Sequence, residues 1–508
     1  MNDFESEIVF PVLRDYQIDV RDRTREAAKN CAHPKRVILQ ASTGAGKSEI
    51  AKDLILRCYA KGRRALFIVS GRALVNQFER HLIRAGVPYG IIMSGRGQND
   101  ALIQLASKET LAARALRRQL AVLPPADLVL IDEAHESMAK EWVQLLDQYK
   151  DAVVIGLTAT PALGNGKGLG AVYGAMERAI STQRLVEEGW LVPCKVFAPD
   201  KPDLRGVGTD SKGDYNRSQL AEKMDRPKIT GNVLTNWRKH ADGRRTVVFG
   251  CTIDHAKHIC DEFNAAGIPF RHVDQETEDN EREDIFGQIQ DGKILGFTNV
   301  SVARRGLDLP CLEVACVVRP TRSLVLWLQM IGRIRRPWPG KADCVVIDHA
   351  GACDFHCLPD DEIEWSLDQT TKIGDWLQEA KDEGKLPPKM LCPKCDCQFA
   401  GQRCPNCGFT FKAKITHTKE VEYADGILVE RTGKAAASLE ELQRYWNKCV
   451  AVAVNRNKQI GSAVPMFADK FNMKPWEVPG LRNLPERDQW KAVAVDLFPG
   501  FKRVKVKG

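Results

Sequence analysis

A glycine-rich turn between an apolar run and a helix-compatible stretch constrains the fold of this chain more than any other feature. The run at residues 37–40 leads into residues 41–48, which contain Gly44 and Gly46 and end in Lys47 and Ser48. Glycines at these positions let backbone N–H groups close around phosphate oxygens, and the following helix N-terminus adds a favourable dipole. The segment therefore predicts a phosphate-binding strand–loop–helix unit, although Ala41 stands where the common pattern has glycine.

An acidic cluster follows a second apolar run. Residues 128–131 are all apolar and lead directly into Asp132, Glu133, Ala134 and His135. In a parallel sheet the carboxyl ends of the strands share one edge, so these acids are expected beside the phosphate-binding loop. Ser48 and Asp132 are predicted to hold Mg²⁺, Asp132 through water, while Glu133 orients and deprotonates an attacking water.

The same alternation of short β-branched runs with longer amphipathic segments occurs twice. It covers residues 36–160 and returns after residue 244, a rhythm that indicates buried parallel sheets. We expect an α/β fold with one domain at 1–198 and another at 199–355. Residues 199–216, which are rich in glycine, proline and aspartate, are expected to be a linker or surface loop.

Six or more motifs in order resemble the core motifs of superfamily-two helicases, over about residues 8–350. Residues 47–48, 132–135 and 158–160 resemble the first three, residues 304–308 the fifth and residues 329–336 the sixth. The resemblance implies two tandem RecA-like domains with ATP in the cleft between them. The loop residues implied in nucleotide binding are Thr43, Gly44, Ala45, Gly46, Lys47 and Ser48, joined by Gly306 and Asp308 from the fifth motif.

The resemblance also implies roles outside the loop. Tyr16 or Arg14 would stack on the adenine and Gln17 would hydrogen-bond its edge, while residues 70–74 and 106–111 would grip the phosphates of a strand. Thr158 and Thr160 would link nucleotide state to strand grip. From the second domain, Gln329 joins the catalytic set and Arg333 and Arg336 act as arginine fingers, with Arg335 as the nearest rival.

The cysteines divide into scattered residues and one cluster. Of 16 cysteines, five lie between Cys392 and Cys407, and the scattered ones are typical of small core residues in a reducing compartment. Two C-x-x-C pairs predict a structural Zn²⁺ held by Cys392, Cys395, Cys404 and Cys407, with an iron–sulfur cluster as the alternative. Cys397 is a spare thiol that could compete with Cys395. We expect a connecting segment at 356–389, a zinc ribbon at 390–412 and a mainly helical accessory region at 413–508.

Composition excludes several classes of protein. Hydrophobic residues make up 44% and charged residues 28%, the balance of a globular protein. No apolar run approaches the roughly 18–20 residues that span a bilayer. The net charge of +8 permits a nucleic-acid partner. The chain is expected in the cytoplasm of a bacterium or of a phage-infected host, without a membrane partner.

The cysteine-rich segment that follows the two domains is similar to that of bacterial RadD-type repair ATPases, and residues 445–479 resemble the tails of helicases from bacteriophages and prophages. Together the features predict an ATP-, Mg²⁺- and Zn²⁺-containing DNA helicase or translocase in replication, recombination or repair. Single-stranded or branched DNA is the expected partner, with RNA left open, together with replication or repair proteins.

Three alternatives remain. The first is a nucleic-acid-stimulated ATPase that remodels complexes without unwinding. The second is the motor subunit of a restriction enzyme, against which no paired carboxylate–lysine nuclease site is seen after residue 350. The third is a non-catalytic zinc-bearing DNA-binding scaffold, against which Lys47, Glu133 and Arg336 argue.

Overall fold

The computed structural model divides into two compact units, Met1–Lys412 and Ala413–Gly508, which are described separately. It describes residues 8–32, 34–96, 99–116, 123–138, 140–163, 166–198, 204, 206–209, 214–224, 227–300, 309–369 and 389–410 of the first unit. In the second unit it describes residues 421–424, 427–430, 443, 445–447 and 449. Most of the helical region expected at 413–508 therefore lies outside the described residues.

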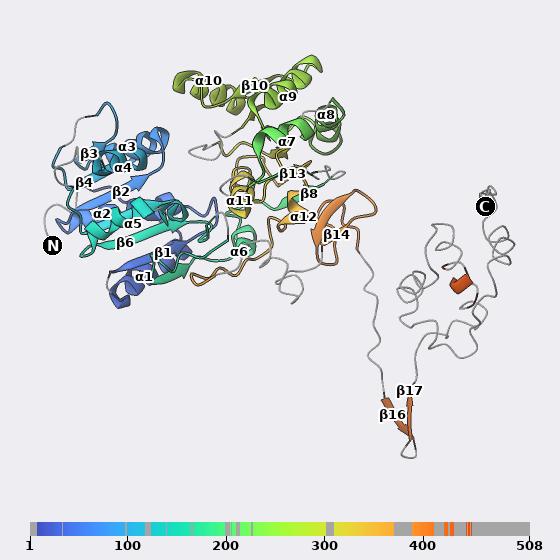
Figure 1. Ribbon diagram of the computed structural model, residues 1–508, viewed down its shortest axis with the longest axis horizontal. Coiled ribbons are helices and arrows are strands. Elements are labelled where there is room, and N and C mark those ends of the chain that lie inside the picture. The colour runs from blue at the N-terminus through green and yellow to red at the C-terminus, as the bar shows by residue number, and fades with distance from the viewer. Residues whose placement is uncertain are drawn as a thin grey trace, which may run out of the picture. The chain divides into compact units, whose positions relative to one another are not determined.

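The first sheet of the larger unit has seven parallel strands in the order β3-β4-β2-β5-β6-β1-β7 (Figure 1). The apolar runs at residues 37–40 and 128–131 form β1 and β5, and two further apolar runs within the alternating region 36–160 form β2 and β6. The strands are β1 (Arg36–Gln40), β2 (Ala65–Val69), β3 (Tyr89–Ile92), β4 (Ile103–Ser107), β5 (Leu128–Asp132), β6 (Val153–Thr158) and β7 (Ala175–Arg178). The helices are α1 (Asp15–Asn30), α2 (Lys47–Ala60), α3 (Arg72–Ala85), α4 (Lys108–Leu116), α5 (Lys140–Leu146) and α6 (Thr182–Glu187), with 3-10 turns η2 (Ala134–Met138) and η3 (Asp147–Tyr149).

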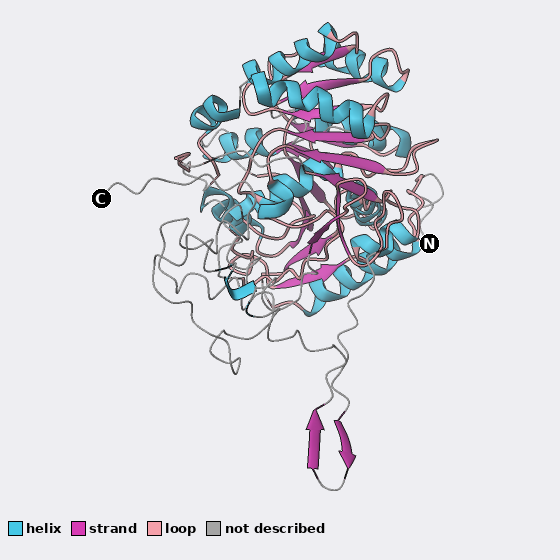
Figure 2. Ribbon diagram, turned by 90° about the vertical axis from the view of Figure 1, so that its right-hand side faces the viewer, coloured by secondary structure: helices cyan, strands magenta, loops and turns pink. Residues whose placement is uncertain are grey.

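Both faces of this sheet are buried, as its unbroken apolar strands require. Ile38 and Val129 enter the core on one face, whereas their neighbours Leu39 and Leu130 enter the core on the other. Successive side chains of a strand point to opposite faces, so a strand covered by helices on both sides must be apolar at every position. Figure 2 shows helices on both sides of the strands.

The second sheet has eight strands in the order β10-β11-β9-β12-β13-β8-β15-β14. The six strands from β10 to β8 are parallel, and β15 and β14 are antiparallel. The strands are β8 (Cys194–Phe197), β9 (Thr246–Phe249), β10 (Phe270–Val273), β11 (Gly296–Asn299), β12 (Val314–Val317), β13 (Cys344–Asp348), β14 (Lys389–Leu391) and β15 (Cys397–Ala400). The helices are α7 (Arg217–Met224), α8 (Pro227–Ala241), α9 (Ile253–Ala265), α10 (Asp279–Gln290), α11 (Leu324–Gly332) and α12 (Ala352–Phe355). Tandem RecA-like α/β sheets, as expected, thus form the body of the chain.

The junction between the two sheets differs from the expected boundary at residue 198. Strand β8 pairs in parallel with β13, so the chain has already entered the second sheet at Cys194. The crossing falls between α6 and β8, and the described residues Leu204, Val207 and Tyr215 pack against the core of the second domain. A four-residue apolar strand can belong to either of two similar sheets, and only the pairing with β13 assigns it.

The expected zinc ribbon is continuous with the second sheet. Cys397 and Gln398 of β15 lie opposite Phe197 and Val196 of β8. Phe399 enters the same core as Phe197. In the smaller unit, β16 (Val421–Ala424) and β17 (Ile427–Glu430) form an antiparallel hairpin.

The described part of the connecting segment returns to the first domain in a non-helical conformation. We call residues 359–369 the strap. The backbone carbonyls of Leu367 and Gln369 accept hydrogen bonds from the N–H groups of Gly170 and Gly168, both at 2.8 Å. Arg178 of β7 donates to the Ile363 carbonyl at 2.6 Å. Residues after the second domain therefore contact the first.

Candidate functional site

The predicted loop, acidic cluster and third motif meet at the carboxyl edge of the first sheet. Strand β1 lies next to β6, with Gln40 opposite Thr158, and β6 lies next to β5, with Leu157 opposite Asp132. The Gln40 side chain donates to the Ala159 carbonyl at 3.1 Å. Parallel pairing thus brings together three segments that are far apart in the sequence.

The loop geometry requires glycine at both predicted positions. Gly44 and Gly46 have φ of +91° and +81°. A Cβ on Gly44 would lie 2.8 Å from Leu191 Cδ2, and one on Gly46 would lie 2.2 Å from Gln17 Nε2. By contrast, Ala41 is buried in the core, and its carbonyl accepts a hydrogen bond from Lys47 Nζ at 3.1 Å. The departure at position 41 is therefore accommodated by packing.

Lys47 and the two acids form a charged group with little solvent. Burial lowers the pKa of Lys47, an effect that the charges of Glu133 and Asp132 oppose. Burial and the Glu133 charge raise the pKa of Asp132 to about 7. Glu133 has a φ of +50°, which is uncommon for a residue with a side chain, and its Oε2 is buried without a hydrogen-bond partner. Adjacent desolvated carboxylates fit a divalent cation bound beside the exposed Ser48.

A chain of polar contacts links the acidic cluster to the third motif. His135 Nδ1 lies 3.1 Å from Thr158 Oγ1, which in turn accepts from the Thr160 backbone N–H at 3.1 Å. His135 Nδ1 also lies 3.3 Å from Glu133 Oε2. Of the predicted coupling residues, Thr158 thus contacts His135 of the acidic cluster directly, and Thr160 is linked to it through Thr158.

Residues 14–17, which were predicted to recognise adenine, pack against the phosphate-binding loop. Tyr16 Oη and Gln17 Nε2 both donate to the Ala45 carbonyl, at 2.9 Å and 3.0 Å. The Arg14 guanidinium lies over the Trp190 ring at 3.8 Å from its centroid. These contacts position the loop, and adenine recognition by Arg14, Tyr16 or Gln17 stays a prediction. Trp190 was not identified from the sequence, where a lone tryptophan carries no motif.

The sixth motif approaches the loop from the second domain. A Cβ on Gly332, the last residue of α11, would lie 2.4 Å from Thr43 Cβ. The Arg336 side chain lies beside the loop, because a Cβ on Gly44 would be 3.7 Å from Arg336 Cγ. The charges of Arg333 and Arg336 both act to lower the pKa of Lys47. The Gln329 side chain is buried nearby on α11. Gly306 and Asp308, predicted from the fifth motif, lie outside the described residues.

Arg335 occupies a different environment from its two neighbours. It is 4% exposed, donates to the Pro359 carbonyl at 2.8 Å and pairs with Asp360. Burial acts to lower the pKa of Arg335, but the Asp360 carboxylate and the neighbouring Cys194 and Cys344 thiols together raise it. The structure therefore separates the rival Arg335 from the two predicted fingers.

The predicted strand-gripping segments gather around Glu136. Ser70 Oγ donates to Glu136 Oε2 at 3.2 Å, and Lys108 Nζ donates to the Glu136 carbonyl at 2.9 Å. Both segments follow strands of the first sheet, β2 and β4, so they share an edge with the loop. Their contact with nucleic acid stays a prediction.

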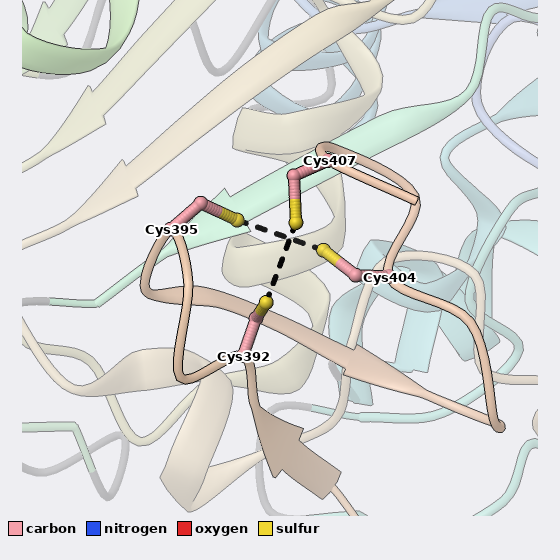
Figure 3. A group of neighbouring side chains, drawn as sticks. All are labelled: Cys392, Cys395, Cys404 and Cys407. Atoms are coloured by element: carbon pink, nitrogen blue, oxygen red, sulfur yellow. Dashed lines mark hydrogen bonds between the residues drawn. The ribbon is translucent and has the colours of Figure 1, made fainter. Parts of the chain in front are cut away.

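The four predicted zinc ligands form one cluster (Figure 3). Their sulfurs all lie within 4.8 Å of one another, and Cys392–Cys407 and Cys395–Cys404 are 3.5 Å and 3.6 Å apart. Four thiolates about 2.3 Å from a tetrahedral Zn²⁺ would be separated by about 3.8 Å. The residues therefore fit this metal. Cys397 is not in the cluster: its side chain is buried in the core of the second domain.

Two family models match the chain in order. The first, described as the res subunit of type III restriction enzymes, matches residues 10–163. The second, the helicase conserved C-terminal domain, matches residues 226–337. The chain belongs to the superfamily-two helicases. It is accordingly a nucleic-acid-dependent ATPase of helicase type, and ATP is its nucleotide.

Individual relatives cover different parts of this superfamily-two chain. It is 26% identical to a 51.5 kDa protein of Lactococcus phage (isolate 7-9), over 85% of this chain and 92% of that protein. It is 27% identical to the putative ATP-dependent helicase IRC3 of Saccharomyces cerevisiae, over 67% of this chain and 52% of IRC3. It is 24% identical to the DNA 3'-5' translocase XPB2 of Sulfurisphaera tokodaii, over 68% of this chain and 85% of that protein. The chain thus spans about half the length of IRC3.

A solved structure supports the fold. A fragment of a putative HsdR subunit of a type I restriction enzyme from Vibrio vulnificus matches 69% of this chain and 67% of that fragment, with 19% identity and a TM-score of 0.51. The closer resemblance to RadD-type ATPases stays a prediction. In the described parts of the chain, every helix is too short or too polar to cross a membrane.

Proposed function

We propose that this helicase-family ATPase moves along DNA and acts in replication, recombination or repair. The observation that carries the proposal is the contact of the sixth motif of one domain with the phosphate-binding loop of the other, where Gly332 lies against Thr43 and Arg336 lies beside Gly44. Complementary halves of a site on separate domains let hydrolysis change the cleft between them, and such a change can drive stepping along a strand. The name of the translocase XPB2 and the basic net charge support DNA as the nucleic acid along which the protein moves.

We assign the roles within the site as follows. The backbone N–H groups of residues 43–48 bind the β- and γ-phosphates, with Lys47 neutralising their charge. Glu133 holds the attacking water and accepts its proton, and Arg333 and Arg336 stabilise the charge that develops on the transferred group. Ser48 and Asp132 would hold Mg²⁺, which when bound screens the phosphate charge. Cys392, Cys395, Cys404 and Cys407 would hold one Zn²⁺, which cross-links the ribbon.

The experiment that tests this function is ATP hydrolysis with single-stranded, duplex and forked DNA and with RNA as effectors. We expect turnover to rise with DNA, and Lys47→Ala to serve as the inactive control. Equal turnover with and without every nucleic acid would contradict a DNA motor. A strand-displacement assay then separates a helicase from a translocase that remodels complexes without unwinding.

The biological setting is part of the same proposal. The phage relative supports a bacterial or phage-infected cytoplasm, with replication or repair proteins as partners, because this chain covers almost all of it. The match to a restriction-subunit model covers the first motor domain alone. DNA cleavage in the effector assay would favour the restriction alternative.

A further inference from the structure

The strap contacts both halves of the motor. At its beginning, Pro359 and Asp360 bind the buried Arg335 of the sixth motif. At its end, Leu367 and Gln369 bind the glycine-rich loop that follows the third motif. Residues 359–369 therefore join the turn that carries the two predicted fingers to the loop after Thr160.

The contact with the first domain is close and specific. A Cβ on Gly168 would lie 2.1 Å from the Leu367 carbonyl oxygen, and one on Gly170 would lie 2.8 Å from the same atom. The Leu367 side chain packs against the core beneath the sheet. Because the obstructing atoms are backbone, a side chain at Gly168 would displace the strap. The absence of side chains at Gly168 and Gly170 thus accommodates the strap.

The strap also lines a cavity that includes Ser42 and Thr43 of the phosphate-binding loop. The cavity has a volume of about 80 Å³. Thr43 and Thr160 line it from the first domain, Gly332 and Arg335 from the second, and Ile363 and Trp365 from the strap. The strap is therefore a third wall of the region where the two domains meet.

In the turn at residues 333–336, Arg335 is anchored to the strap and Arg336 lies beside Gly44 of the phosphate-binding loop. The Arg335 backbone carbonyl also accepts a hydrogen bond from the Val192 N–H at 2.9 Å, close to the crossing between domains. A buried cation needs a partner charge, and here the strap supplies it through Asp360. A displacement of Asp360 would therefore displace the turn that contains Arg333 and Arg336.

We propose that Asp360 is a positioning residue for ATP hydrolysis, and that the strap sets the placement of Arg333 and Arg336 against the phosphate-binding loop. Asp360 acts through Arg335 and does not itself touch the nucleotide. The attachment of the strap to Gly168 and Gly170 fixes the position of the first domain relative to the sixth motif. The proposal rests on the ATPase activity of the chain.

The test is steady-state ATP hydrolysis with saturating DNA. Asp360→Asn removes the charge at one end of the strap, and Gly168→Ala displaces its other end. Because the fingers act in the transition state, we expect each variant to lower kcat by about 10- to 100-fold with an unchanged KM for ATP. The matched controls are Glu364→Gln, an exposed strap carboxylate, and Gly287→Ala, whose Cβ would meet no atom within 4 Å.

Thermal unfolding shows which variants remain folded at the assay temperature. If Asp360→Asn unfolds, Gly168→Ala carries the test, because it leaves the Arg335–Asp360 pair in place. Turnover by both folded variants at the level of their controls would overturn the proposal. A fall in kcat matched by a rise in KM would also overturn it, because that result indicates loss of the whole site. An inactive wild-type protein would instead contradict the proposed function.

Discussion

At the residue scale, the site is governed by charges that burial alone would neutralise. Burial lowers the pKa of Lys47 and raises that of Asp132, while each of these groups favours the charged form of the other. A triphosphate and a divalent cation would add both signs of charge to this group. The pairing explains why a lysine and two acids can share one largely buried edge.

The first prediction separates phosphate binding from water activation. Lys47→Ala removes the cation at the phosphates, so both ATP binding and turnover should be lost. Glu133→Gln leaves the loop intact, so ATP should bind while turnover falls by at least about 100-fold, the typical contribution of a general base. Nucleotide-binding and turnover measurements on both variants check this. Near wild-type turnover in Glu133→Gln would disprove its assigned role.

The second prediction concerns the three arginines of the sixth motif. Arg336→Ala should leave stability unchanged and slow hydrolysis by about 10³- to 10⁵-fold, the range for arginine fingers. Arg335→Ala should lower the free energy of unfolding by about 1–3 kcal/mol, because the hydrogen bonds of its buried guanidinium to the Pro359 carbonyl and to the half-exposed Asp360 are lost. Denaturant unfolding and single-turnover hydrolysis distinguish the two. An Arg335→Ala protein that is stable and hydrolyses ATP as slowly as expected for Arg336→Ala would show that the two assignments are reversed.

The third prediction is a pH dependence of stability. His349 is buried at the end of β13, and burial lowers its pKa to about 4. Below pH 6.5 the unfolded chain binds a proton that the folded chain excludes until about pH 4. Stability should therefore be lost as pH falls from 6.5 to 4, with about 3 kcal/mol contributed by this histidine.

Urea unfolding of wild type and His349→Gln between pH 4 and pH 8 measures that contribution. The variant should show a shallower loss of stability across the acidic range, whatever its stability at neutral pH. Parallel curves for the two proteins would exclude His349 as a source of the dependence.

At the element scale, the pairing of β15 with β8 changes what loss of zinc should do. A free-standing ribbon would unfold alone and leave the α/β domains intact. Here Cys392 and Cys404 pack into the core that contains Phe197 and Val345 of the second sheet. Unfolding of the ribbon would uncover the edge of β8, which lies next to β13 in that sheet.

The fourth prediction follows from that pairing. Purified protein should contain one Zn²⁺ per chain, and Cys404→Ser should release it and lower the unfolding temperature of the second domain. Cys397→Ala is the matched control, because that thiol lies outside the cluster and the variant should keep its zinc. Metal analysis and calorimetry measure both effects. A Cys404→Ser protein with full zinc content would overturn the ligand assignment.

At the scale of the whole molecule, every described site residue lies in the first compact unit. That unit, Met1–Lys412, contains the loop, the sixth motif, the strap and the cysteine cluster, whereas Ala413–Gly508 forms the other. The residues proposed to bind ATP, those proposed to bind zinc and the strap therefore share one body of the chain.

The fifth prediction is that a chain ending at Lys412 retains ATP binding and hydrolysis. Its turnover without DNA should match that of the full chain within about twofold, since the truncated chain keeps every described site residue and ΔG‡ should therefore be nearly unchanged. Comparison of the two chains with and without DNA then shows whether residues 413–508 are needed for stimulation by DNA or for ATP hydrolysis itself. Loss of hydrolysis without DNA would place part of the motor beyond residue 412.

The sequence by itself determined the α/β class, the loop, the acidic cluster and the grouping of four cysteines, because each depends on local spacing. Gly44 and Gly46 need φ values that side chains disfavour, and two C-x-x-C pairs can close on one ion. Such requirements are contained in a few consecutive residues.

Only the tertiary structure decided the partners that come from distant parts of the chain. The assignment of β8 to the second sheet, the burial of Cys397, the anchoring of Arg335 by Asp360 and the docking of Leu367 on Gly168 all join residues without a shared motif. A short apolar strand, a lone cysteine or a glycine fits many environments. Which environment it occupies depends on packing between elements, and no local pattern contains that information.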